Sequence, residues 1–293
     1  MILKNPATGK IEVDFPAAER RKKVIRTLAV SLSLTLLLAG VIGLIFFYRA
    51  ASGDPILPPL LNAVQITIFG IVYGKVAEAL TEFENHKTIL DFNSALFRKL
   101  VFCYFVSNFA APFYIAFIKS GVDGCPNFLT ADDDGPDFCG LELMTTVALA
   151  FMGNDFGGRM STSLIIPRLM GMYAKWEAQN DKTVDFDNMG PVEKQYRLLS
   201  PYDPTRELIM DYIELYVQWG YLTLFGASCP FVVAFALITN LVETRTDGAK
   251  LFNDYRRVMP NRVDGIGEPL LMFYYVLYAA VVNLAEKLSI HLS

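Results

Sequence analysis

Four carboxylates near the polar ends of two apolar segments are the residues of this sequence best suited to chemistry. Asp211 and Glu214 stand three apart at the start of IMDYIELYVQWGYLTLF, and Glu243 and Asp247 stand four apart at the end of the next apolar segment. These spacings place each pair on one face of a helix. Carboxylate oxygens are the donors that Ca2+ prefers, so the chemistry that these residues predict is cation binding.

The two segments are joined so tightly that their acids should face each other. The turn SCP at 228–230 ends helical continuity at its proline and predicts an antiparallel helical hairpin. Counted from Cys229, Glu214 lies 15 residues before the turn and Glu243 lies 14 after it, while the two aspartates lie 18 away on either side. At about 1.5 Å per residue, the four acids form two matched layers, the first about 22 Å from the turn.

Two interpretations of the four acids are open. At the centre of a membrane helix each acid would cost about 2.5 to 3.5 kcal/mol to insert, and a shallower position lowers this cost. A bound divalent cation would offset both desolvation and repulsion, and Ca2+ suits flexible carboxylate geometry better than Mg2+. Alternatively, the acids sit at the membrane interface and pair with Arg206 or Arg245. The symmetry of the hairpin favours the metal site.

Composition places the chain in a membrane class. It has 293 residues, 53% hydrophobic and 19% charged, with a mean hydropathy of +0.34. The net charge of -4 argues against a nucleic-acid partner. With only His86 and His291, a zinc site rich in histidine or a Ser-His-Asp relay has almost nothing to be built from. The sequence also carries no phosphate-binding loop, nucleophile elbow or HExxH motif, so we expect that it is not an enzyme.

Seven apolar runs predict an all-α fold, a polytopic helical membrane protein. Each has about 18 residues or more when interfacial residues are counted, as a hydrocarbon core of about 30 Å requires, and no period-two alternation favours a barrel. We expect a cytosolic N-terminal segment at 1–25 and a transmembrane domain at 26–293 that contains a polar cytosolic connection at 171–207. The runs are 27–48, 58–80, 97–118, 140–167, 208–227, 230–244 and 268–290.

Positive charges predict the orientation of these runs. If the cluster ERRKKVIR at 19–26 is cytosolic, alternate crossings put nearly every later lysine and arginine on the same side, and only Arg49 and Lys119 flank outer loops. This distribution follows the positive-inside rule and supports the number of crossings. We therefore expect an integral, multi-pass protein with a cytosolic N-terminus, in the plasma membrane rather than the endoplasmic reticulum.

The four cysteines divide into two kinds. Cys125 and Cys139 bound an acidic, turn-rich outer loop, CPNFLTADDDGPDFC, which a disulfide can close in an oxidising exterior. Two unpaired thiols are the alternative. Cys103 and Cys229 lie in apolar surroundings, where we expect small packing residues.

Several stretches of the chain resemble one family. The stretch DYIELYVQWGYLTLFGASCPFVVAFALITNLVETRTDGAKLF resembles the seventh and eighth helices of the anoctamins, a family of calcium-activated chloride channels and phospholipid scramblases. NPATGKIEVDFP resembles the segment before the third helix, LTEFENHKT the end of the fourth, FYIAFIKS the end of the fifth, and RRVMPNRVDGIG the approach to the ninth. The resemblance covers essentially the whole chain. It implies a fragment of a ten-helix fold that lacks the N-terminal domain, two helices and the tenth helix, which usually carries the contact of the homodimer.

The resemblance also assigns roles to residues. It implies that the four acids match the calcium ligands of the family, and that a groove lined by the fourth to seventh helices carries ions or lipids. Gly153 matches the hinge glycine of the sixth helix, whereas Arg159 and Ser163 stand where the family has further oxygen ligands. Arg159 either pairs with the acids, lowering calcium affinity or fixing that helix, or reaches toward lipid headgroups. Lys75 and Asp155 either line the groove or form a buried ion pair.

These observations predict calcium-regulated transport of phospholipids, chloride or other small ions across the membrane. Cation binding between the sixth, seventh and eighth family helices would neutralise the acids and let the sixth helix move about Gly153. Membrane lipids and small ions are the expected partners, together with a second copy of the protein. The alternative function is a membrane tether or scaffold that does not transport.

Overall fold

A computed structural model describes residues 2–4, 11–13, 16–52, 57–122, 140–153, 168–169, 171–173, 176–177, 190–199, 202, 204–226, 229–257 and 265–292. The described residues are almost entirely helical, as the apolar runs predicted. The exception is a short hairpin, in which β1 (Ile2–Lys4) pairs with β2 (Ile11–Val13) in antiparallel register. The helices are α1 (Ala17–Ser52), α2 (Leu57–Glu84), α3 (Ile89–Phe113), α4 (Lys119–Val122), α5 (Gly140–Phe151), α7 (Pro191–Leu198), α8 (Pro204–Phe225), α9 (Pro230–Ala249) and α10 (Glu268–Leu292). Two π-helical turns, η1 (Tyr114–Ile118) and η4 (Lys250–Asp254), extend α3 and α9.

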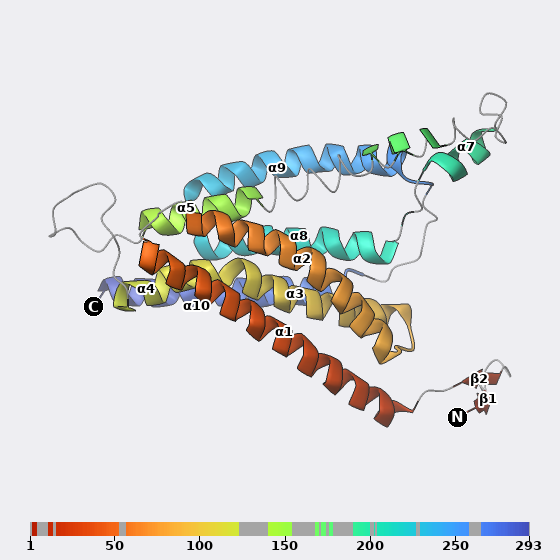
Figure 1. Ribbon diagram of the computed structural model, residues 1–293, viewed down its shortest axis with the longest axis horizontal. Helices are drawn as coiled ribbons and strands as arrows, with labels where there is room; N and C mark the ends of the chain where they lie inside the picture. The colour runs from red at the N-terminus through yellow and green to blue at the C-terminus, as the bar shows by residue number, and fades with distance from the viewer. Residues whose placement is uncertain are drawn as a thin grey trace.

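The long helices run side by side and alternate in direction. The start of α1, the end of α2, the start of α8 and the end of α9 lie at one end of the bundle, on the right of Figure 1. At this end Arg20 Nε donates to the carbonyl of Asn85 at 3.2 Å. The opposite end holds α4 and the start of α5, where Lys119 pairs with Glu142. The end with the start of α1 carries the arginine- and lysine-rich cluster, so it corresponds to the side that the charge pattern predicts to be cytosolic.

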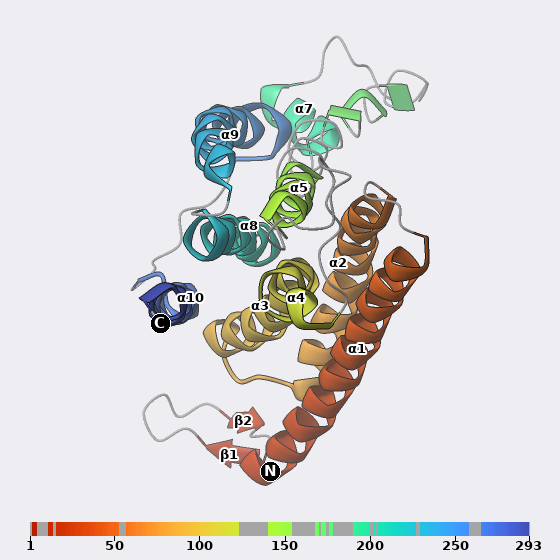
Figure 2. The ribbon, with the colours of Figure 1, turned by 90° about the vertical axis from the view of Figure 1, so that its left-hand side faces the viewer.

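Figure 2 shows the bundle end-on. Helices α1, α2 and α3 pack against one another, and α3 also contacts α8, which in turn contacts α10 and α9. Helix α5 lies between α2 on one side and α8 and α9 on the other. The hairpin of α8 and α9 is therefore held against the rest of the bundle by α3, α5 and α10.

An aromatic cluster joins α3, α5 and α8. The ring of Tyr221 meets the rings of Phe109 and Phe151 edge-on, with centroids 5.0 and 6.1 Å apart. The Tyr221 hydroxyl donates to the backbone carbonyl of Asn108 at 3.1 Å. Since Tyr221, Phe109 and Phe151 are buried, this cluster combines apolar burial with a satisfied polar group and fixes the depth of α8 beside α3.

Gly220 allows the close approach of α8 to α3. A Cβ at this position would lie 2.3 Å from Cζ of Phe109. Only a residue without a side chain leaves room for the ring, so the position excludes alanine unless the aromatic cluster moves.

Three helices within the described part of the chain are long and apolar enough to cross a membrane, judged by length and composition. They span Ala17–Tyr48, Leu60–Glu84 and Ile89–Ile118, and shorter apolar helices lie at Glu142–Phe151 and Glu268–Val282. The predicted runs 208–227 and 230–244 are helical as α8 and α9, but both helices include charged residues, which lower their hydropathy. The several long apolar helices agree with a polytopic membrane protein.

The two buried cysteines are confirmed as packing residues. Cys103 and Cys229 are free thiols, each almost fully enclosed. Cys125 and Cys139 lie outside the described residues, so their disulfide stays a prediction.

Candidate functional site

A hydrogen bond between α8 and α9 sets the register of the hairpin. Gln218 on α8 donates from Nε2 to Oγ1 of Thr239 on α9 at 3.2 Å. The same nitrogen lies 3.5 Å from the carbonyl of Ala236. Gln218 is 11 residues before Cys229 and Thr239 is 10 after it, so the two helices run past each other with a difference of one residue.

A second contact, at the far end of the hairpin, has the same offset. Nζ of Lys250, directly after α9, lies 2.8 Å from Oε2 of Glu207 in the first turn of α8. Glu207 is 22 residues before Cys229 and Lys250 is 21 after it. Two contacts with one offset define a continuous antiparallel seam between the helices.

The four predicted acids lie on this seam, between its two contacts. Glu214 is one helical turn from Gln218, and Glu243 is one turn from Thr239, so the same offset puts Glu214 opposite Glu243. Asp211 interacts electrostatically with Asp247 and Glu243 of the facing helix. The register therefore gives the two helices the alignment that the sequence count predicted for these residues.

The donor set fits a calcium ion in its chemistry and register, but the side chains do not converge. Among the residues that the structure describes, no three histidine, cysteine or acidic side chains form a group that could hold a metal ion as it stands. Facing carboxylates repel one another, which favours separated rotamers. Asp211, Glu214, Glu243 and Asp247 supply oxygen donors of the kind that Ca2+ takes, and rotamer changes or an approach of the helices would be needed to gather them.

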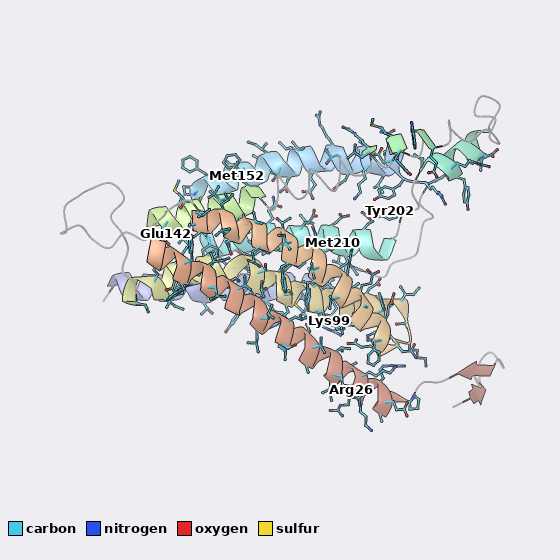
Figure 3. All side chains as sticks on the ribbon, in the orientation of Figure 1. Arg26, Lys99, Glu142, Met152, Tyr202 and Met210 are labelled. Carbon is cyan, nitrogen blue, oxygen red and sulfur yellow. The ribbon has the colours of Figure 1, made fainter. Side chains whose placement is uncertain are left out.

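At the end of the seam farthest from the turn, two tyrosine rings lie near Lys250. The ammonium lies 5.6 Å from the centre of the Tyr255 ring, and Tyr202 meets Tyr255 edge-on at 5.4 Å. Figure 3 labels Tyr202 between the start of α8 and the end of α9. Burial raises the pKa of Tyr255 to about 12, and the nearby Glu207 adds to the shift. Burial alone would lower the pKa of Lys250, but the hydrogen bond and the charge of Glu207 outweigh it and raise that pKa.

The other predicted site residues are placed only in part. Gly153 lies at a π-helical turn that continues α5, and a Cβ there would be 3.5 Å from Cβ of Ala63 on α2, an ordinary contact. Lys75 is exposed on α2. Arg159, Ser163 and Asp155 lie outside the described residues, so their roles stay predictions.

The alternative to a metal site was that the acids lie at the membrane interface and pair with Arg206 or Arg245. Arg245 is exposed on α9, and nothing about the side chain of Arg206 is described. Pairing of the acids with either arginine therefore stays an untested alternative. Among the described residues, a cation that does lie on the seam is Lys250, which the sequence analysis missed. Its signal was available, because the count from Cys229 that pairs the acids also pairs Glu207 with Lys250.

A second charged cluster, which joins α1, α2 and α3 near the end of the bundle that holds the start of α1, was also missed. Glu84 is only 1% exposed, and its carboxylate lies 2.8 Å from Nζ of Lys99 and 2.7 Å from Nε2 of His86. Thr27 of α1 donates to the same carboxylate. Lys99, labelled in Figure 3, also donates to Oγ1 of Thr81 at 3.2 Å. No local sequence pattern predicts this cluster, because it depends on how three different helices pack together.

These features define an integral, multi-pass helical membrane protein with an acidic seam inside a helical hairpin. A family model described as "Anoctamin: Calcium-activated chloride channel" matches residues 1–286. The chain belongs to the anoctamin family.

Individual relatives agree with the family assignment. The chain is 28% identical over 317 residues to Anoctamin-7 of Homo sapiens, an alignment that covers 99% of this chain and 33% of that protein. It is 31% identical to Anoctamin-7 of Mus musculus, over 97% of this chain and 35% of that protein. Similarity to Anoctamin-1 of Homo sapiens is 27%, over 71% of this chain and 22% of that protein. The chain spans about a third of the length of the Anoctamin-7 relatives that it matches.

Proposed function

We propose that the protein carries out calcium-regulated transport across the membrane, moving chloride, phospholipids or both. The observation that carries this proposal is the register of α8 and α9, in which two contacts of one offset bracket four facing acids. The family model, described as a calcium-activated chloride channel, supports the same function. We place the activity at the plasma membrane, in a homodimer.

The four acids would hold the ion, and their geometry suggests how binding acts on the fold. Bound calcium supplies positive charge that offsets carboxylate repulsion. The side chains of Asp211, Glu214, Glu243 and Asp247 would then turn toward one another across the seam, drawing α8 and α9 together. A ligand shifts a conformational equilibrium only by its differential affinity for the two states, and gathering the acids supplies that difference.

Helix α5 is placed to transmit the change. It lies against α8 and α9 on one side and α2 on the other. Its last described residues form a π-helical turn at Gly153, where an added Cβ would make only an ordinary contact with Ala63, and π-helical turns inside α-helices are frequent at functional sites. In this proposal Gly153 is the hinge, and Arg159 and Ser163 move with the segment that follows it. Lys75, exposed on α2, and Asp155 would line the transport path.

The test is transport by the purified protein in liposomes. Scrambling of fluorescent lipids and efflux of chloride are followed in parallel, with and without calcium. The wild type is compared with the double variant Glu214→Gln, Glu243→Gln, which removes one proposed ligand from each helix of the hairpin. Lys75→Gln, which removes a charge from the exposed side of α2, serves as a variant whose calcium midpoint should stay near that of the wild type while its rate changes.

The result expected is calcium-stimulated flux that the double variant loses, and the substrate that moves distinguishes a channel from a scramblase. Flux without any response to calcium or to the double substitution would keep transport and remove the calcium switch. Folded protein without flux of either substrate would support a tether or scaffold instead.

A further inference from the structure

Lys250 occupies the seam that the four acids share. It follows Asp247 by three residues, on the same face of the helix and one turn closer to the end of the hairpin. Its side chain is 9% exposed and pairs with Glu207 at 2.8 Å. Asp211 also interacts electrostatically with it, so its charge is felt by the acids as well as by its direct partner.

The surroundings of Lys250 hold a cation in place. The ring of Tyr255 lies next to the ammonium. Tyr202, just before α8, packs edge-on against Tyr255, which follows α9. The backbone N–H of Tyr255 donates to the carbonyl of Lys250 at 3.2 Å, which closes the π-helical turn η4. A lysine with a carboxylate partner and an aromatic neighbour is fixed in position, unlike a surface lysine free to swing into solvent.

We propose that Lys250 is a built-in cation that lowers the affinity of the acidic seam for calcium and thereby sets the calcium concentration at which the protein responds. Its ammonium repels an entering divalent ion. It also neutralises Glu207, the next carboxylate along the seam, by pairing with it. This inference rests on the proposed function, because it concerns the strength of the same site.

Opposite changes of charge should shift calcium binding in opposite directions. Lys250→Met removes the positive charge and frees Glu207, so calcium should bind about tenfold more tightly, given the strength of charge interactions at an effective dielectric constant of about 20. Glu207→Gln removes a negative charge and leaves the ammonium without its partner, so binding should weaken by about the same factor. Lys250→Arg keeps the charge and should change the midpoint by less than about twofold.

The experiment measures binding directly as well as transport. Calcium is titrated against the purified protein, and the rise in its thermal unfolding temperature gives the affinity, because a ligand that binds only the folded state stabilises it. The calcium midpoint of flux is then measured on the same variants in liposomes. Arg98→Met is the matched control, since Arg98 is also a paired cation of the bundle but its partner is Glu268 on α10.

The outcomes separate this inference from the proposed function. A lower midpoint for Lys250→Met and a higher one for Glu207→Gln, with Lys250→Arg and Arg98→Met unchanged, support the inference. A wild type that binds calcium while Lys250→Met and Glu207→Gln bind it equally well overturns the inference and leaves the calcium site standing. A wild type without calcium-dependent stabilisation overturns both. If Lys250→Met does not fold, Glu207→Gln and Lys250→Arg still decide the result.

Discussion

Removing the carboxylate of Glu84, at the end of α2, should lower the stability of the protein more than removing an exposed charge would. The side chain is 1% exposed, and its partner Lys99 is 10% exposed. Glu84→Gln keeps the shape and can still accept the hydrogen bond from Thr27. The substitution nevertheless leaves the ammonium of Lys99, and the hydrogen-bonded His86, without a negative partner. Loss of one member of a buried ion pair typically costs about 3 to 5 kcal/mol, and we expect a loss in this range.

The assay is unfolding of the purified protein in detergent, followed by temperature or denaturant. The double variant Glu84→Gln, Lys99→Met removes both charges and should recover most of the lost stability, because a neutral replacement of a buried pair is often tolerated. Glu268→Gln, which breaks the pair between Glu268 and the half-exposed Arg98, is the control and should cost less than about 1 kcal/mol.

Two results would refute the reasoning about Glu84. One is a single variant that costs no more than the control Glu268→Gln, which would mean that water or other groups already satisfy Lys99. The other is a double variant as unstable as Glu84→Gln alone, which would show that the carboxylate acts through Thr27 and His86 rather than through the ammonium.

Two further predictions concern the packing of α8 against α3 and the ion pair between Lys250 and Glu207. Gly220→Ala should destabilise the protein by about 1 to 3 kcal/mol, because the added Cβ overlaps the ring of Phe109. Gly74→Ala is the control and should not destabilise it, because a Cβ there meets nothing within 4 Å. Equal stabilities of the two variants in thermal unfolding would contradict this packing. The raised pKa of Lys250 means that its pairing with Glu207 is fully present below the ordinary lysine pKa of about 10.4 and is lost only as the pH rises through the higher folded-state value. The loss of stability in Lys250→Met should therefore be the same at about pH 6.5 and pH 9, and a loss that shrinks across this window would count against the pairing.

The sequence by itself determined the helical membrane class and predicted the pairing of the acids. Apolar runs long enough to span a bilayer predict helices, because a backbone in lipid must satisfy its own hydrogen bonds. The pairing of Glu214 with Glu243 followed from a count about Cys229, since a tight turn between two regular helices leaves little freedom of register. The contact between Gln218 and Thr239 agrees with that count. The same regularity would have found the pair of Glu207 and Lys250, had the count been carried to the end of the hairpin.

Only the tertiary structure decided which helices pack together and which charges are buried. Glu84 and Lys99 are 15 residues apart in sequence, and the Thr27 that completes their cluster comes from a different helix altogether. Their contact depends on how α1, α2 and α3 cross, which no local periodicity records. The contact of Gly220 with Phe109 also depends on this packing. A glycine on an apolar helix face indicates a close approach by another residue, but the sequence does not identify which residue approaches it. Local patterns specify helices and the register across one short turn, whereas contacts between distant segments depend on the packing of the whole bundle.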